Sequence, residues 1–176
     1  GANSTDDGTF YRYDGTKIIA AAYATDTTRN YVKGYVDIIT YRGEAYVTNQ
    51  TTIVRWQNDN TITQDFATFT TGNVLHPAIV FEDNAFYGDN NLLLRQTAAA
   101  GAPATILTLA VGEIIIALGV DPGSGKMLIS TTSSLNVSNA RTSINKLHWY
   151  DGFSNKVLKV VYVEDMITGF HTVGGI

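Results

Sequence analysis

Short apolar runs, alternating with polar residues or continuous, extend along the whole chain and are separated by glycine, asparagine and aspartate. Runs of this length between turn-forming residues predict β-strands rather than helices. Residues 97–105 are the best helical candidate, but Gly101 and Pro103 disfavour a helix interior, so we expect a loop there. The pattern predicts an all-β chain.

Several pairs of runs are joined by a turn signal and predict β-hairpins. Asp14-Gly15 and Arg42-Gly43 are two such signals, and residues of this kind tolerate the backbone of tight turns. We expect four hairpins, and a further turn at Asp151-Gly152 that leads into a strand over 157–163. The four hairpins cover residues 11–20, 36–47, 78–87 and 106–118.

Similar segments recur along the chain. Four of them centre on an arginine or histidine beside aromatic or apolar residues, and these centres are spaced by 43, 40 and 53 residues. Extra turn residues at 121–125 and 133–143 account for the longest interval. The four segments are 11–14, 54–57, 94–96 and 147–151. A second set of similar segments is 43–47, 83–87 and, more loosely, 112–116.

Four short strands in roughly forty residues is the size of one β-propeller blade. Such a blade cannot bury both faces alone, so consecutive blades must pack against one another. We expect one domain over 1–176, a propeller of about four blades or a fragment of a larger ring. A sandwich or jelly roll, and a β-solenoid, are the alternatives. The repeats lie near 10–52, 53–92, 93–145 and 146–176.

The order of strands and turns in 41–47 and 53–59 resembles kelch-type propeller repeats, with an aromatic residue before an Asp-centred turn. The Gly-Gly pair typical of that family is missing, and Asn49 replaces a glycine in the first copy. The Tyr-Asp-Gly hairpins also resemble propeller modules of phage tail and other virion surface proteins. These resemblances imply blades of four antiparallel strands and structural partners within a particle or surface.

The composition of the chain excludes several functional classes. Charged residues make up 16% of the chain, the net charge is −4, and the lysines and arginines are scattered. Nucleic-acid binding requires clustered cations, so we expect no nucleic-acid partner. Without cysteine there is neither a disulfide framework nor a thiolate metal site. The longest apolar stretch, 106–120, is interrupted by Gly112 and Glu113, so we expect no membrane span. Because the chain begins at Gly1, we expect a processed or truncated product.

Residues 119–126 contain Gly-Ser-Gly-Lys but do not have the spacing of a phosphate-binding loop, and a strand follows them rather than a helix. We therefore expect a hairpin loop there. Three histidines, His76, His148 and His171, lie far apart and none has a metal-ligand partner at short spacing. We expect structural or exposed roles for them.

Five carboxylates form the pool from which glycosidase chemistry could draw, since that chemistry needs two of them across a pocket. They are Asp37, Glu44, Asp83, Glu113 and Asp165. Oxygen-rich loops at 58–60, 82–84 and 89–91 suit Ca²⁺, but asparagine and aspartate are also ordinary turn residues. We assign no catalytic residue, no metal and no cofactor, and the ligand-binding residues stay unknown.

The sequence thus predicts a non-enzymatic structural or adhesive propeller of an extracellular surface or virion, such as a phage tail or fibre component. Its expected partners are other structural proteins of the particle or surface. The alternative is a carbohydrate-binding lectin or a glycan-active propeller enzyme, in which exposed aromatic side chains stack on sugars. For Trp56 and Trp149 we expect packing between blades instead.

Overall fold

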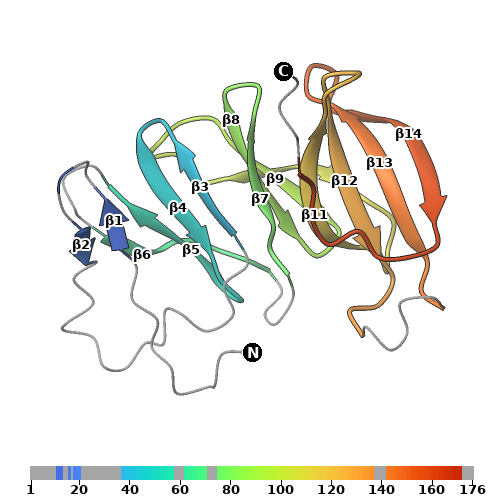
Figure 1. The fold of residues 1–176 in the computed structure, drawn as a ribbon, viewed down its shortest axis with the longest axis horizontal. Helices are drawn as coiled ribbons and strands as arrows, with labels where there is room; N and C mark the ends of the chain where they lie inside the picture. Colours follow the sequence, from blue (N-terminus) through green and yellow to red (C-terminus); the bar gives the residue numbers. More distant parts are fainter. Residues whose placement is uncertain are drawn as a thin grey trace.

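The computed structural model consists of β-strands and loops, and the part of the chain that it describes contains no helix (Figure 1). The described residues are 11–13, 16, 18–20, 37–57, 62–70, 75–136 and 142–171. They form three four-stranded antiparallel sheets and one two-stranded pair. The prediction of an all-β chain is confirmed.

Each four-stranded sheet is built from four strands that follow one another along the chain. Sheet 1 contains β3 (Asp37–Tyr41), β4 (Glu44–Thr48), β5 (Thr52–Trp56) and β6 (Ile62–Thr68). Sheet 2 contains β7 (Ala78–Phe81), β8 (Asn84–Asp89), β9 (Leu92–Gln96) and β10 (Ala104–Thr108). Sheet 3 contains β11 (Ile114–Asp121), β12 (Lys126–Thr132), β13 (Asn145–Asp151) and β14 (Lys156–Val163). The separate pair consists of β1 (Tyr11–Tyr13) and β2 (Ile18–Ala20).

The sheets follow one another side by side across the molecule (Figure 1). The first strands of consecutive sheets are neighbours: β3 contacts β7, and β11 contacts β7 and β8. Three predicted hairpins are confirmed as the pairs β1–β2, β3–β4 and β7–β8. The turn between β3 and β4 adopts positive φ as expected, with 49° at Arg42 and 79° at Gly43.

The predicted hairpin over 106–118 is wrong, because β10 and β11 belong to different sheets. The Ile115 amide donates instead to the carbonyl of Asn90, in the turn between β8 and β9. An apolar run, a glycine and a second apolar run look the same whether the chain turns back or passes to the next sheet. For the same reason 112–116 is not the third copy of 43–47, since it enters a first strand while 43–47 enters a second strand.

Three of the four arginine- and histidine-centred segments, 54–57, 94–96 and 147–151, lie on or beside the third strands β5, β9 and β13, with Trp149 rather than His148 at the place of Arg55 and Arg95. The repeats that we began at 53, 93 and 146 therefore start within third strands, whereas each sheet begins at β3, β7 or β11. A repeat has the same length wherever it is cut, so the spacing of the segments indicates the period but not the start of a sheet.

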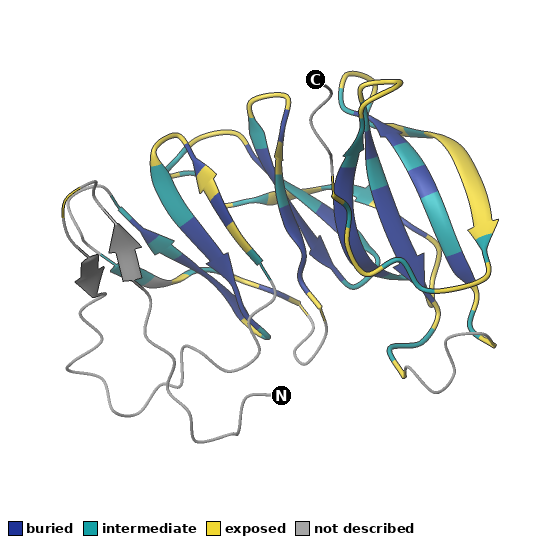
Figure 2. Ribbon diagram, in the orientation of Figure 1, coloured by how far each residue is buried: buried dark blue, intermediate teal, exposed yellow. Residues whose placement is uncertain are grey.

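Two apolar clusters fill the spaces between the sheets, and the buried residues follow the strands (Figure 2). The cluster between sheets 1 and 2 includes Tyr46, Ile53 and Tyr87. The cluster between sheets 2 and 3 includes Phe86, Leu93 and Ile129. In the described residues we find no helix of the length and apolar character that crossing a membrane requires.

Candidate functional site

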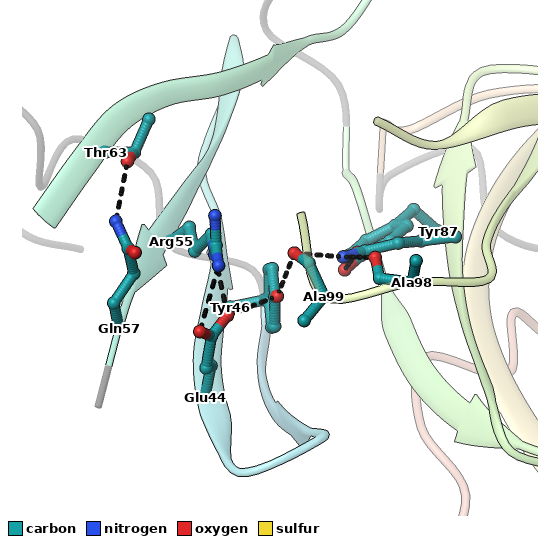
Figure 3. A network of polar contacts seen from close by, with 9 residues as sticks. Glu44, Tyr46, Arg55, Gln57, Thr63, Tyr87, Ala98 and Ala99 are labelled. Atoms are coloured by element: carbon teal, nitrogen blue, oxygen red, sulfur yellow. Dashed lines mark hydrogen bonds and ion pairs between the residues drawn. The ribbon is translucent and has the colours of Figure 1, made fainter. Parts of the chain in front are cut away.

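The ionisable residues of the described chain gather mainly where one sheet meets the next. The first cluster is centred on Glu44 of β4 (Figure 3). Arg55 of the neighbouring strand β5 binds this carboxylate through two hydrogen bonds, Nε to Oε2 at 2.6 Å and Nη2 to Oε1 at 2.9 Å. Two-point contacts of this kind fix the orientation of both groups as well as neutralising them. Both side chains are largely buried, at 14% and 11% exposed.

Tyr46 extends the first cluster from sheet 1 to sheet 2 (Figure 3). Its hydroxyl lies 2.8 Å from Glu44 Oε2 and 2.6 Å from the carbonyl oxygen of Ala99, in the loop after β9. Gln96 donates to that carbonyl from its other side at 3.2 Å, and accepts a hydrogen bond from Tyr87 at 2.7 Å. The chain of polar contacts therefore runs without a break from Arg55 to Tyr87.

The environment raises the pKa values of both tyrosines of this cluster above the ordinary value, at which a phenol is already protonated at neutral pH. Burial raises the pKa of Tyr46 to about 12, and its hydrogen bond to the Glu44 carboxylate adds to the shift. Burial also raises the pKa of Tyr87. Phenols held in this state donate hydrogen bonds but are poor bases and nucleophiles. The cluster is therefore suited to holding two sheets together.

A second cluster surrounds His76, which is completely buried just before β7. Its Nδ1 lies 3.0 Å from the carbonyl oxygen of Gly88 and its Nε2 lies 3.2 Å from that of Gln50. The imidazole stacks on Phe69 with ring centroids 3.7 Å apart. Because Gln50 belongs to sheet 1 and Gly88 to sheet 2, the ring bridges the two sheets.

Asp89 borders the second cluster, with Oδ1 4.0 Å from His76 Nδ1. Its other oxygen accepts hydrogen bonds from both the amide and the hydroxyl of Thr70, at 2.7 and 2.6 Å. These contacts fasten the end of sheet 1 to the turn between β8 and β9.

The third cluster combines a carboxylate, a lysine, a histidine and a hydroxyl beside sheet 3. Glu113, which immediately precedes β11, contacts Lys146 Nζ at 2.5 Å through Oε1 and His148 Nε2 at 3.1 Å through Oε2. Thr131 of β12 lies 3.1 Å from the same histidine nitrogen. Glu113 raises the pKa of Lys146, whereas burial lowers that of His148 despite the opposing effect of Glu113.

These residue types resemble a catalytic triad, but their geometry differs from one. In a triad the histidine contacts the nucleophile through one ring nitrogen and the acid through the other. Here Thr131 and Glu113 both face Nε2 of His148, while Nδ1 is buried and has no hydrogen-bond partner among the described residues. Thr131 is only 1% exposed and His148 4%. The third cluster is thus a buried ion pair with an attached histidine.

The five carboxylates that the sequence suggested for glycosidase chemistry have separate contacts. Asp37 accepts a hydrogen bond from the amide of Ala78 at the start of β7, 3.1 Å away. Asp83, in the turn between β7 and β8, pairs at 2.9 Å with Arg42, in the turn between β3 and β4. Glu44 and Glu113 belong to the first and third clusters. Asp165 is exposed after β14.

The described loops among those considered for phosphate and calcium are turns in the structure. Residues 119–126 form the hairpin between β11 and β12, where the Asp121 carboxylate accepts hydrogen bonds from Gly123, Ser124 and Trp149. The acidic loops 82–84 and 89–91 join consecutive strands of sheet 2, and the loop 58–60 lies outside the described residues. The predicted hairpin at 119–126 is confirmed.

Sequence reasoning missed the partners Arg55 and Lys146. Arg55 lies directly across from Tyr46, and Lys146 lies across from Thr131 and two residues before His148. For Lys146 the available signal was a second ionisable residue at a spacing of two, because such residues share one face of a strand, whereas Arg55 is the one charged residue of β5 and gave no such signal.

The chain matches no protein-family model, and no curated protein shows significant similarity to it. The charged groups of the three clusters contact other groups of the protein. In the first and second clusters these contacts join sheet 1 to sheet 2.

Proposed function

We propose that this chain is a structural or adhesive β-propeller module of an extracellular surface or virus particle, and that it does not act as an enzyme. The observation that carries the proposal is the repeated side-by-side packing of sheets through their first strands, β3 on β7 and β7 on β11. A propeller consists of such sheets repeated around a common axis, and that arrangement is what we propose. Such a module offers a rigid surface on which loops can vary.

The polar clusters support a structural role. Glu44 and Glu113 each bind a cation within about 3 Å, at a distance where the charges are largely neutralised before any ligand arrives. Tyr46 and His76 connect sheets rather than lining a site. A surface with few charges and many threonine, asparagine and tyrosine residues also suits a module that meets many neighbours without strong electrostatic bias.

A glycan-binding function is the second candidate, and exposed aromatic side chains favour it. Phe153, at the turn between β13 and β14, is 95% exposed, and Tyr162 of β14 is 72% exposed. Flat aromatic faces on the surface can stack on sugar rings. Phe153→Ala and Tyr162→Ala would then weaken binding on a glycan array without changing the fold.

A hydrolysis screen on oligosaccharides, run together with the glycan array, tests the proposal. We expect no turnover by the wild-type chain. Turnover that is lost in Glu113→Gln or Asp37→Asn would overturn the non-enzymatic assignment, because those carboxylates would then be catalytic. Binding to the array without turnover, abolished by Phe153→Ala, would favour the lectin over a purely structural module.

A further inference from the structure

One face of sheet 3 points away from sheet 2. The residues on this face occupy the same positions as residues that are buried between sheets in sheets 1 and 2. In each sheet the first two strands form a hairpin. Counted from the turn, the third pair of opposed residues points toward the following sheet in sheets 1 and 2, and away from sheet 2 in sheet 3. These pairs are Ile39–Tyr46 in sheet 1, Ile79–Phe86 in sheet 2 and Gly119–Leu128 in sheet 3. The next residue of this face on the second strand is Thr48, Gly88 or Ser130. Its partner on the third strand is Ile53 in sheet 1, Leu93 in sheet 2 and Leu147 in sheet 3.

In the first two sheets these positions form the interface with the following sheet. Ile39, Tyr46 and Ile53 belong to the cluster between sheets 1 and 2. Phe86 and Leu93 belong to the cluster between sheets 2 and 3. Gly88, also on this face, approaches sheet 3 so closely that an added Cβ would lie 2.8 Å from Ile115. The equivalent face of sheet 3 therefore has the pattern of a third docking face.

Residues 164–171, which we call the cap segment, lie on part of this face. The segment follows β14 and runs back across sheet 3 (Figure 1). A Cβ at Gly119 would overlap the ring of Phe170, so this ring occupies the place that isoleucine holds at positions 39 and 79. Asn145 donates a hydrogen bond to the carbonyl of Glu164 at 3.2 Å. The cap segment contains no strand.

The rest of the face is apolar and only partly covered. Leu128, Leu147 and Trp149 are half-buried, and Val161, opposite Leu147, is 36% exposed. The face also carries charged residues of both signs, with Asp121, Lys126 and Asp151 near the turns and Lys159 on β14. Lys159 on β14 lies 4.5 Å from the centre of the Trp149 ring.

Asp121 on β11 accepts a hydrogen bond from the indole of Trp149 at 3.0 Å. β11 and β14 form the two opposite edges of sheet 3. A two-fold axis parallel to the strands places β14 of each copy over β11 of the other. Asp121 lies level with Lys126, Asp151 and Lys156 across the sheet, so Asp121 of one copy then faces Lys156 of its partner, and the apolar residues of the neighbouring rows meet. The face is therefore complementary to itself, as a two-fold interface requires.

We propose that the outer face of sheet 3 is a self-association surface for a second copy of this chain, and that the cap segment covers it through Phe170 on Gly119. Displacement of the cap segment exposes the apolar face, and the same face of a second copy then occupies it. The equivalence of the sheets identifies this face as a docking face; because sheets 1 and 2 meet through unlike faces, the choice of a second copy rests on the two-fold charge complementarity. The inference does not depend on the biological role proposed above.

Sedimentation of the full chain over a range of concentrations tests the proposal. We expect a monomeric wild type. Phe170→Ala removes the anchor of the cap segment, and Gly119→Ile restores the isoleucine of sheets 1 and 2 and expels the ring. Both variants should dimerise, with a dissociation constant about tenfold or more below that of the wild type. Phe153→Ala is the matched control, because it removes an exposed phenylalanine outside this face and should stay monomeric.

A second substitution identifies the surface used. Val161→Asp places a charge on the proposed face and should return Phe170→Ala to a monomer. Leu158→Asp changes an exposed residue of the same strand, 58% exposed, that lies at the irregularity of the β13–β14 ladder, and should leave the dimer intact. If only Leu158→Asp returned Phe170→Ala to a monomer, the two copies would be pairing through the edge of β14, which would overturn the proposal.

Circular dichroism of each variant completes the test. If Phe170→Ala and Gly119→Ile are folded and monomeric, the face is not a docking surface. If both are unfolded, the cap segment is part of the core and not a displaceable cover, which also overturns the proposal. A wild type that dimerises as tightly as Phe170→Ala would show that the cap segment does not control association.

Discussion

Tyr46→Phe removes one hydroxyl from the contact between sheets 1 and 2 and leaves the ring in place. Phenylalanine is the natural residue at the equivalent position of sheet 2, Phe86, so we expect no steric cost. The hydroxyl contacts a carboxylate at 2.8 Å and a carbonyl at 2.6 Å. A hydrogen bond to a charged group typically contributes about 1.5–3 kcal/mol.

The remaining partners set the expected size of the effect. Glu44 keeps both hydrogen bonds from Arg55, and the carbonyl of Ala99 keeps the one from Gln96. Because no buried group is left without a partner, we expect the free energy of unfolding to fall by about 2 kcal/mol. The corresponding decrease in the melting temperature is about 4–8 °C for a domain of this size.

Urea denaturation followed by circular dichroism measures this change. Tyr162→Phe is the matched control, because its hydroxyl belongs to a residue that is 72% exposed, and we expect it to stay within about 0.5 kcal/mol of the wild type. A double-mutant cycle with Glu44→Gln isolates the part of the effect that passes through the carboxylate. A loss for Tyr46→Phe no larger than that of Tyr162→Phe would refute the assigned role of the network.

Three further predictions follow from the buried groups and the close contacts. Tyr46 and Tyr150, whose pKa values burial raises to about 12, should not ionise in a spectrophotometric titration until the pH approaches that value. Because burial lowers the pKa of His148, the unfolded chain binds more protons than the folded one below about pH 6.5, so stability should fall as the pH drops through this range, and His148→Asn should reduce that dependence. Gly88→Ala should cost about 1–3 kcal/mol, because the added Cβ would meet an isoleucine side chain of β11 at 2.8 Å, whereas Gly101→Ala, with its nearest contact at 3.5 Å, should cost far less.

Each of these predictions has a contrary outcome. Tyrosines that all titrate near pH 10 would contradict the burial of Tyr46 and Tyr150. A stability profile that is unchanged by His148→Asn in mildly acidic solution would mean that the third cluster does not exclude the proton. Equal unfolding free energies for Gly88→Ala and Gly101→Ala would show that sheets 2 and 3 are not in close contact at position 88.

Local features of this fold could be predicted well from the sequence. Arg42-Gly43 marks a tight turn because positive φ is required there, and the alternation on either side determines which residues share a face. The period of the repeats could also be predicted, because Arg55 and Arg95 occupy the same position on equivalent third strands. The turns depend only on residues close together in the sequence, and the period depends only on the recurrence of similar segments along it.

Contacts between sheets could not be predicted in the same way. Residues 106–118 read as a hairpin because the pattern does not distinguish a return within one sheet from a passage to the next. The partners of Glu113 lie 18 to 35 residues away in the sequence, and only the packing of β11 to β13 brings them together. Such clusters depend on how strands assemble, and a single sequence gives no direct record of that assembly.

Every described ladder joins strands that are consecutive along the chain, so each four-stranded sheet forms from one continuous stretch of sequence. Tandem duplication or loss of one such stretch would leave the hairpins of the other sheets unchanged and would present a similar face to whatever follows. Molecules of this design can gain or lose length in whole sheets, and folding can begin in any one of them without waiting for distant parts of the chain.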